Sequence, residues 1–212
     1  MTLTTPSDKV LQVEDLVFER NGCTIFSGVN FHLEEGELLL LQGSNGCGKS
    51  TLMRILTTLV RPQQGRVCSY GENIYDDKHK YLSNIIFIGH QLALKLALSP
   101  LDNLNWSASS SRDRQYIFKV MDEMGLGAVS GLPCYRLSAG QLKRVALTKL
   151  FVSDAKLWLL DEPFVALDLS GISIIEKLIN RHLKHNGSVL MTSHQDLSLS
   201  NIRKLDMSVW CR

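Results

Sequence analysis

A glycine-rich segment at residues 43–51 carries the clearest chemistry in the sequence. It fits the pattern G-x-x-x-x-G-K-[ST], in which the N–H groups of a loop surround phosphate oxygens. The following helix N-terminus adds a partial positive charge, and Lys49 adds a full one that acts on the reacting phosphates. The segment therefore predicts a nucleoside triphosphate site, and its residues are Gly43, Ser44, Asn45, Gly46, Cys47, Gly48, Lys49, Ser50 and Thr51.

Two side chains of this loop have separate interpretations. Ser50 follows Lys49, the position from which a hydroxyl reaches Mg²⁺. Cys47 lies inside the loop, and we interpret it as a small, permissive side chain rather than a redox switch, because we expect no resolving thiol nearby.

Two adjacent carboxylates follow a second apolar run, Leu157 to Leu160. They fall where a parallel strand ends, at the edge of an α/β sheet where ligands bind. We expect Asp161 to hold Mg²⁺ and Glu162 to orient and polarise the attacking water. A solvated strand end before Pro163 is the plainer interpretation, but it weakens beside a phosphate-binding loop. Together the two motifs predict a nucleoside triphosphatase.

A third motif, Leu-Ser-Ala-Gly-Gln at residues 137–141, lies shortly before these carboxylates. Ser138 is expected to cap a helix whose outward N–H groups form an anion site. With the two motifs above, this segment resembles the signature of the ABC ATPases. The resemblance implies that Ser138, Gly140 and Gln141 grip the ATP bound to a second cassette, so that two chains enclose two nucleotides. A simple helix cap is the alternative.

The same resemblance implies roles for three more residues. Gln91 resembles the residue that senses the γ-phosphate, joins the Mg²⁺ ligands and touches an integral membrane transporter subunit. Asp168 resembles the aspartate of the loop that follows the catalytic glutamate in this family. His194 resembles the switch histidine, and from the end of the strand at 188–192 it would reach the γ-phosphate and the water that Glu162 orients.

The adenine-contacting residue departs from the family pattern, which has an aromatic side chain upstream of the phosphate-binding loop. Arg20 aligns best with that position, and a guanidinium plane can stack on adenine. Phe18 lies two residues earlier and remains an alternative, if strand alternation aims it outward.

Several further stretches resemble one subfamily, the ATP-binding subunits of haem exporters in bacterial cytochrome c maturation. They include Ile88 to Gln91, Leu157 to Asp168 and Thr192 to Asp196, and Ala139 replaces the usual glycine of the signature. The resemblance implies haem export from a peripheral position on the cytoplasmic side of the inner membrane. Other small lipid or drug exporters share these features in part.

Periodicity predicts the elements that position these residues. An antiparallel hairpin opens the chain, with strands at 10–18 and 23–33 around Asn21-Gly22. Apolar strands at 37–41, 84–89, 156–160 and 188–192 alternate with helical segments, including one at 50–60, which favours parallel pairing. We also predict a last strand at 206–210. The fold class is α/β, with a P-loop NTPase core, a mixed sheet and an antiparallel β subdomain.

Residues 91–152 show helical spacing at 100–106, 112–124 and 138–151 and no strand pattern. We predict one cassette over residues 1–212, with a core at 1–90 and 153–212 and a helical subdomain at 91–152.

Composition narrows the partners. The net charge of +2 and the pI of 8.3 do not favour a basic nucleic-acid-binding stripe. The 5 cysteines show neither zinc spacing nor a disulfide framework, which is typical of a reducing compartment. The first nine residues lack a signal peptide, and no apolar run reaches membrane-spanning length.

Two rival functions remain at this point. A non-transport ABC scaffold in DNA repair or on ribosomes usually has coiled coils or two cassettes per chain, whereas each motif occurs once here. A degenerate cassette that binds ATP without hydrolysis is the other, and the presence of Lys49, Asp161, Glu162 and His194 argues against it.

Overall fold

A computed structural model describes residues 9–109, 112–195 and 198–211 of the chain; the N-terminal segment 1–8 and Asp196 lie outside the described residues. The strands are β1 Lys9–Arg20, β2 Cys23–Glu34, β3 Leu38–Gln42, β4 Gln64–Ser69, β5 Glu72–Asn73, β6 Ile85–Ile88, β7 Leu157–Asp161, β8 Ser188–Thr192 and β9 Ile202–Asp206. The α-helices are α1 Lys49–Leu56, α2 Lys78–Ser83, α3 Pro100–Ser107, α4 Arg114–Glu123, α5 Ala139–Val152 and α6 Leu169–Lys184. Short 3₁₀ turns are η2 Gly127–Val129, η3 Cys134–Arg136 and η4 Met207–Val209.

The predicted hairpin is confirmed as the start of an antiparallel sheet. Asn21 (φ 52°) and Gly22 (φ 76°) adopt the left-handed backbone that a tight hairpin turn requires, so Arg20 pairs with Cys23. The sheet has four strands in the order β2-β1-β4-β5.

The second sheet is parallel and has five strands in the order β6-β7-β8-β3-β9. Its inner strands are apolar because both faces are covered. In β3, Leu38 and Leu40 pack into one hydrophobic cluster, whereas Leu39 and Leu41 pack into the other. This alternation joins two cores through one sheet.

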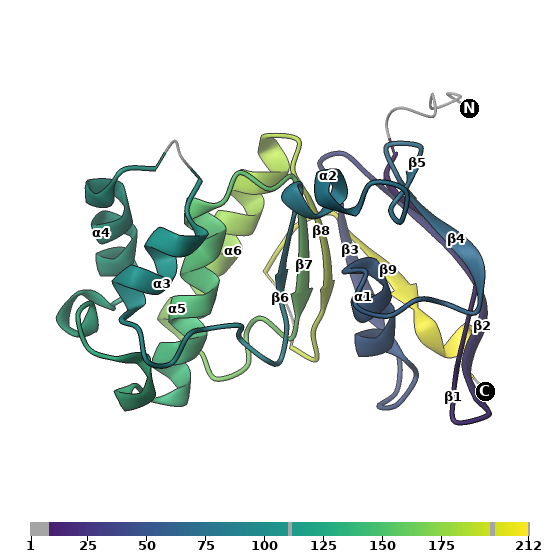
Figure 1. Cartoon of the computed structure of the whole chain (residues 1–212), viewed down its shortest axis with the longest axis horizontal. Helices are drawn as coiled ribbons and strands as arrows, with labels where there is room; N and C mark the ends of the chain where they lie inside the picture. Colours follow the sequence, from purple (N-terminus) through teal and green to yellow (C-terminus); the bar gives the residue numbers. More distant parts are fainter. Residues whose placement is uncertain (1–8, 110–111, 196–197, 212) are drawn as a thin grey trace.

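Helices cover the parallel sheet on both faces. Helix α1 buries Leu52, Met53, Ile55 and Leu56 between this sheet and the antiparallel one, while α5 and α6 cover the opposite face and α3 and α4 lie beyond them (Figure 1). No strand occurs among the described residues from 91 to 152, which agrees with the predicted helical segments. Within the described ranges no helix combines the length and the apolar character that a membrane span requires.

Three local predictions were wrong. The last strand is β9, residues 202–206, and not 206–210, where η4 follows instead. Because β9 is an edge strand, its residues are only half-buried or exposed, and its sequence lacks an apolar run. Helix α1 ends at Leu56 rather than near residue 60, and the short strands β4 and β5 went unpredicted.

Candidate active site

The phosphate-binding loop connects β3 to α1 and depends on glycine at two positions. Gly43 (φ 133°) and Gly48 (φ 90°) have backbones that other residues rarely adopt. A Cβ atom at Gly43 would lie 2.7 Å from Cys47 Sγ, and one at Gly48 would lie 2.6 Å from the ring of Phe26. The loop is therefore shaped by close packing as well as by backbone conformation.

The Lys49 side chain reaches back to the start of this loop. Its Nζ donates hydrogen bonds to the carbonyl oxygens of Gly43 (2.6 Å) and Ser44 (3.1 Å). Helix α1 begins at Lys49 after the N-cap Gly48, which has no side chain to cap the first N–H groups. An ammonium group and uncapped N–H groups at one helix start favour a bound anion.

The structure corrects the expectation that no resolving thiol lies near Cys47. Cys211, 164 residues later, places its Sγ 2.8 Å from the carbonyl oxygen of Cys47, so the two cysteines are neighbours. Burial is the main cause that raises the pKa of Cys211 to about 11, and Cys47 contributes to the shift. The Cys211 thiol is thus held in its neutral, less nucleophilic form beside the loop.

Asp161 and Glu162 lie at the carboxyl end of β7, as the apolar run predicted. Thr192, at the end of the neighbouring β8, connects them: its Oγ1 donates to Asp161 Oδ1 (2.7 Å) and accepts the N–H of Glu162 (2.9 Å). Asp161 is 9% exposed, so this hydroxyl replaces solvent for one carboxylate oxygen. Thr192 is not among the residues predicted for the site, although a polar residue that ends an apolar strand is a usable signal.

Glu162 faces His194 across the sheet edge. The distance from Glu162 Oε1 to His194 Nε2 is 3.5 Å. Within the described part of the chain, Glu162 Oε1 is buried without a hydrogen-bond partner. A buried, unsatisfied carboxylate oxygen favours a further donor from a molecule bound in the cavity.

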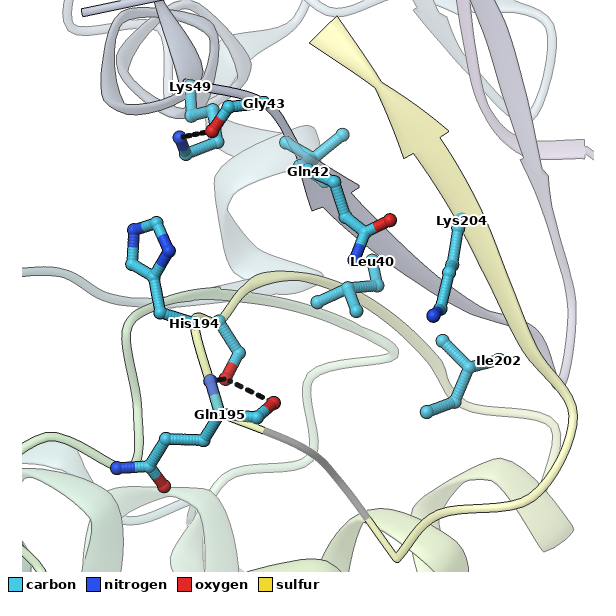
Figure 2. A pocket seen from close by; sticks show the side chains of 10 residues that line it. Leu40, Gln42, Gly43, Lys49, His194, Gln195, Ile202 and Lys204 are labelled. Atoms are coloured by element: carbon cyan, nitrogen blue, oxygen red, sulfur yellow. Dashed lines mark hydrogen bonds between the residues drawn. The ribbon is translucent and has the colours of Figure 1, made fainter. Parts of the chain in front are cut away.

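These residues converge on one cavity of about 340 Å³. Its lining residues are Arg20, Ile25, Asn45, Gly46, Gly48, Lys49, Ser50, Thr51, Asp161, Glu162 and His194. A second cavity shares Lys49 and His194 and continues between β3, β9 and the loop after β8. Figure 2 shows His194 projecting from that loop toward the side on which Lys49 and Gly43 lie.

Arg20 and Phe18 occupy different environments at the end of β1. Arg20 is exposed and lines the cavity of about 340 Å³. Phe18 is 6% exposed and packs against Phe26 with the ring centroids 6.0 Å apart, so it faces the core and not the solvent. Of the two alternatives, only Arg20 lines the cavity.

The signature segment lies elsewhere. Ser138 caps α5 as predicted: its Oγ accepts the N–H of Gln141, and Gln141 Oε1 accepts the N–H of Ser138, at 3.2 and 2.9 Å. Ser138 is exposed. None of the following predicted site residues, all within the described part of the chain, lines either cavity: Gln91, Ser138, Gly140, Gln141 and Asp168.

The α5 helix nevertheless contacts the loop that follows Glu162. Arg144 Nη2 lies 2.7 Å from Asp168 Oδ1, and Asp168 also caps α6 by accepting the N–H of Gly171 (3.0 Å). That backbone bond is the main cause that lowers the pKa of Asp168. Asp168 therefore has an architectural position in this chain.

Comparisons with known proteins agree with this geometry. The family profile described as "ABC transporter" matches residues 26–165. The Cytochrome c biogenesis ATP-binding export protein CcmA of Escherichia coli O157:H7 is 38% identical over 201 residues, covering 94% of this chain and 97% of the relative. The protein of the same name from Pseudomonas syringae pv. syringae (strain B728a) is 37% identical over 211 residues, covering 97% and 98%.

A solved structure gives the fold. A putative ABC transporter ATP-binding protein from Pyrococcus furiosus superposes with a TM-score of 0.80, covering 95% of this chain and 99% of that one, at 23% identity. The predicted fold class, with a P-loop core, two kinds of sheet and a helical portion, is confirmed.

Proposed function

The chain belongs to the ABC transporter family of ATP-binding cassettes, and on this premise we propose that it hydrolyses ATP to power an exporter in cytochrome c biogenesis, with haem as the cargo. One observation carries the ATPase part of this proposal. Lys49, Asp161, Glu162 and His194 converge on a single cavity at the carboxyl edge of the parallel sheet.

The triphosphate is proposed to lie along the loop 43–51, where Lys49 and the start of α1 supply positive charge. Arg20 lies at the same cavity, on β1, and is proposed to stack its guanidinium on adenine.

Mg²⁺ is proposed to bind Ser50 and Asp161, which line the same cavity. Their hydroxyl and carboxylate oxygens are the hard ligands that this ion prefers, and Asp161 Oδ1 is already fixed by Thr192. The described residues contain no group of three or more His, Cys, Asp or Glu side chains that would bind a metal alone, so phosphates and water must complete the shell. When bound, Mg²⁺ neutralises charge on the transferring phosphoryl group. Gln91 remains a proposed additional ligand, although it lines neither cavity.

Hydrolysis is assigned to the pair at the sheet edge. The Glu162 carboxylate orients and polarises the attacking water, while His194, 3.5 Å away, donates toward the γ-phosphate as negative charge develops there. Lys49, which lines the same cavity, is proposed to hold that phosphate.

The other half of each nucleotide site is proposed to come from a second copy of this chain. Ser138, at the start of α5, is exposed and does not line the chain's own cavity. In an isologous pair, this helix start would meet the γ-phosphate held by the partner, with Gly140 and Gln141 beside it. ATP then closes the pair through its higher affinity for the closed state.

A membrane partner is proposed to dock beside Gln91. Three large apolar side chains are exposed on or next to the segment that follows Gln91 in the sequence: Leu96 is 51% exposed, Tyr135 67% and Trp106 76%. The N–H of Tyr135 bonds to the Leu96 carbonyl, and Lys95 stacks over the Trp106 ring at 3.7 Å, so the three form one patch. An exposed apolar patch of this kind favours a protein contact. The chain would therefore act peripherally on the cytoplasmic side of the inner membrane.

Purification and transport assays test the proposal. A tagged chain is isolated from the membranes of its source organism and should bring a polytopic membrane protein with it; recovery with ribosomes or DNA would contradict a transport role. After reconstitution in liposomes, ATP should drive haem movement with release of phosphate. The Glu162→Gln variant should lower the rates of haem movement and of phosphate release at least about 100-fold. ATP-driven movement of a lipid or drug without haem would refute the cargo.

A further inference from the structure

The first two turns of α5 lie along the loop that connects β7 to α6. A Cβ atom at Gly140 would be only 3.1 Å from the carbonyl oxygen of Ala166. Lys143 Nζ donates to the carbonyl oxygen of Glu162 (2.9 Å), and Arg144 pairs with Asp168. Helix α5 thus contacts the start of this loop at Glu162, its middle at Ala166 and its end at Asp168.

The Glu162 residue has a backbone that needs support. Its φ is 49°, a left-handed conformation that is uncommon outside glycine and persists where surrounding groups hold it. Both polar groups next to its Cα are held: Thr192 Oγ1 accepts its N–H, and Lys143 donates to its C=O. The direction of the Glu162 side chain follows from this conformation.

Lys143 is an unusual residue for its place. It is 7% exposed, and burial is the main cause that lowers its pKa, while the nearby carboxylates of Asp161 and Glu162 oppose the shift. A buried ammonium group carries a desolvation cost that an apolar side chain of the same length avoids. The hydrogen bond that Lys143 donates to the Glu162 carbonyl oxygen therefore needs an explanation other than burial of apolar surface.

We propose that Lys143 is a positioning residue for ATP hydrolysis. It holds the Glu162 peptide so that the carboxylate points at the attacking water. Because Lys143 and Ser138 share one helix, movement of Ser138 against a partner's nucleotide is passed to Glu162 in the same chain. This inference rests on the proposed function of Glu162 as the residue that orients water.

The test replaces Lys143 in the complete transporter complex. Lys143→Met keeps a flexible, unbranched side chain and removes the donor, so kcat should fall about 10- to 100-fold, the loss that a small misplacement of a catalytic group causes. The Kd of ATP, measured in a Glu162→Gln background, should stay within about twofold, since Lys143 lines neither cavity. Lys143→Arg keeps a donor and should restore kcat to within about fivefold of wild type.

Lys149→Met is the matched control. Lys149 lies on the same helix, its Nζ donates to the Ala93 carbonyl (2.9 Å), and burial lowers its pKa as well. Lys149→Met should reduce thermal stability by about as much as Lys143→Met does, and it should lower kcat less than about threefold. Equal kcat losses in the two methionine variants would overturn the proposal and leave Lys143 a structural residue.

Other outcomes are also decisive. An unchanged kcat in Lys143→Met, while Glu162→Gln abolishes hydrolysis, overturns the inference and leaves the proposed function intact. Full hydrolysis by Glu162→Gln overturns the proposed role of Glu162 instead. If Lys143→Met does not fold, Lys143→Gln replaces it, because its amide is shorter and cannot reach the same carbonyl; wild-type kcat in that variant would overturn the positioning role.

Discussion

Helices α1 and α5 both present an N-terminus for anion binding, but they do so in different surroundings. The α1 helix starts at a glycine without a side-chain cap, and its loop lines a cavity that also contains Asp161, Glu162 and His194. The α5 helix starts after Ser138, which is exposed, closes a capping box and lines neither cavity. The cavity at α1 is lined by the proposed catalytic residues of the same chain, whereas the proposed anion site at Ser138 lines neither of these cavities.

This difference separates two kinds of contribution. Residues around α1 should determine how tightly one chain binds ATP, because they line the cavity proposed to hold it. Residues at the start of α5 should affect the reaction only when a second chain brings its nucleotide to them. Variants in the two regions should therefore change different kinetic constants.

The largest effect is expected from Lys49→Ala. The variant removes the only full charge that the loop 43–51 offers to the phosphates, so we expect the rate to fall about 1000-fold and the Kd of ATP to rise at least about 10-fold. Phosphate release and isothermal titration measure the two constants. Lys80→Ala removes an exposed lysine that pairs with Glu72 and should change neither. An unaltered Kd of ATP in Lys49→Ala would contradict the proposal that the loop 43–51 binds the phosphates of ATP.

The next effect is expected from Ser138→Phe. A bulky side chain at the start of α5 should block a partner's phosphate, lowering kcat about 100-fold while the Kd of the single chain stays within about twofold. Asp113→Ala is the control, because Asp113 caps α4 in the same way by accepting the N–H of Tyr116 (2.7 Å). Each change removes one helix cap and should cost about 1 kcal/mol of stability. A higher Kd of ATP for the single chain, with unchanged kcat, would show that Ser138 acts on the ATP of its own chain and not on that of a partner.

A smaller effect is expected from Thr192→Val. This substitution removes the hydroxyl between Asp161 and Glu162 without changing shape, so we expect kcat to fall about 10-fold and stability by about 1–3 kcal/mol. Thr148→Val removes a comparable buried hydroxyl, which donates to the Arg144 carbonyl (2.7 Å), and should reduce stability alone. If both valine variants keep the wild-type kcat, Thr192 contributes to folding and not to alignment of the carboxylates.

The same contrast explains what the sequence allowed us to predict. The loop 43–51, the hairpin turn and the Ser138 cap are each encoded by residues that are adjacent in the chain, so spacing was sufficient. Contacts between distant segments were not predictable in this way. Lys143 reaches Glu162, Thr192 joins two strands, and Cys211 reaches Cys47 only because the sheet order and the helix packing place them together.

The predicted position of the last strand was wrong for a related reason. Strand β9 pairs on one side only, with β3, and its exposed residues are polar, so it lacks the apolar run that marked β7 and β8. The division into a core and a helical subdomain at residues 91–152 remains a prediction, as do the roles of Gln91 and Asp168.

The smallest effect is expected from Arg20→Ala, which tests the base-binding side of the α1 site. Stacking of a guanidinium on adenine contributes about 0.5–2 kcal/mol, so the Kd of ATP should rise about 2- to 30-fold with kcat unchanged. Inorganic tripolyphosphate is the matched ligand, because it has no base, and its affinity should not change. Equal weakening of both ligands would show that Arg20 contributes charge to the phosphates. No weakening of either would leave adenine without a contact from β1, since Phe18 is buried against Phe26.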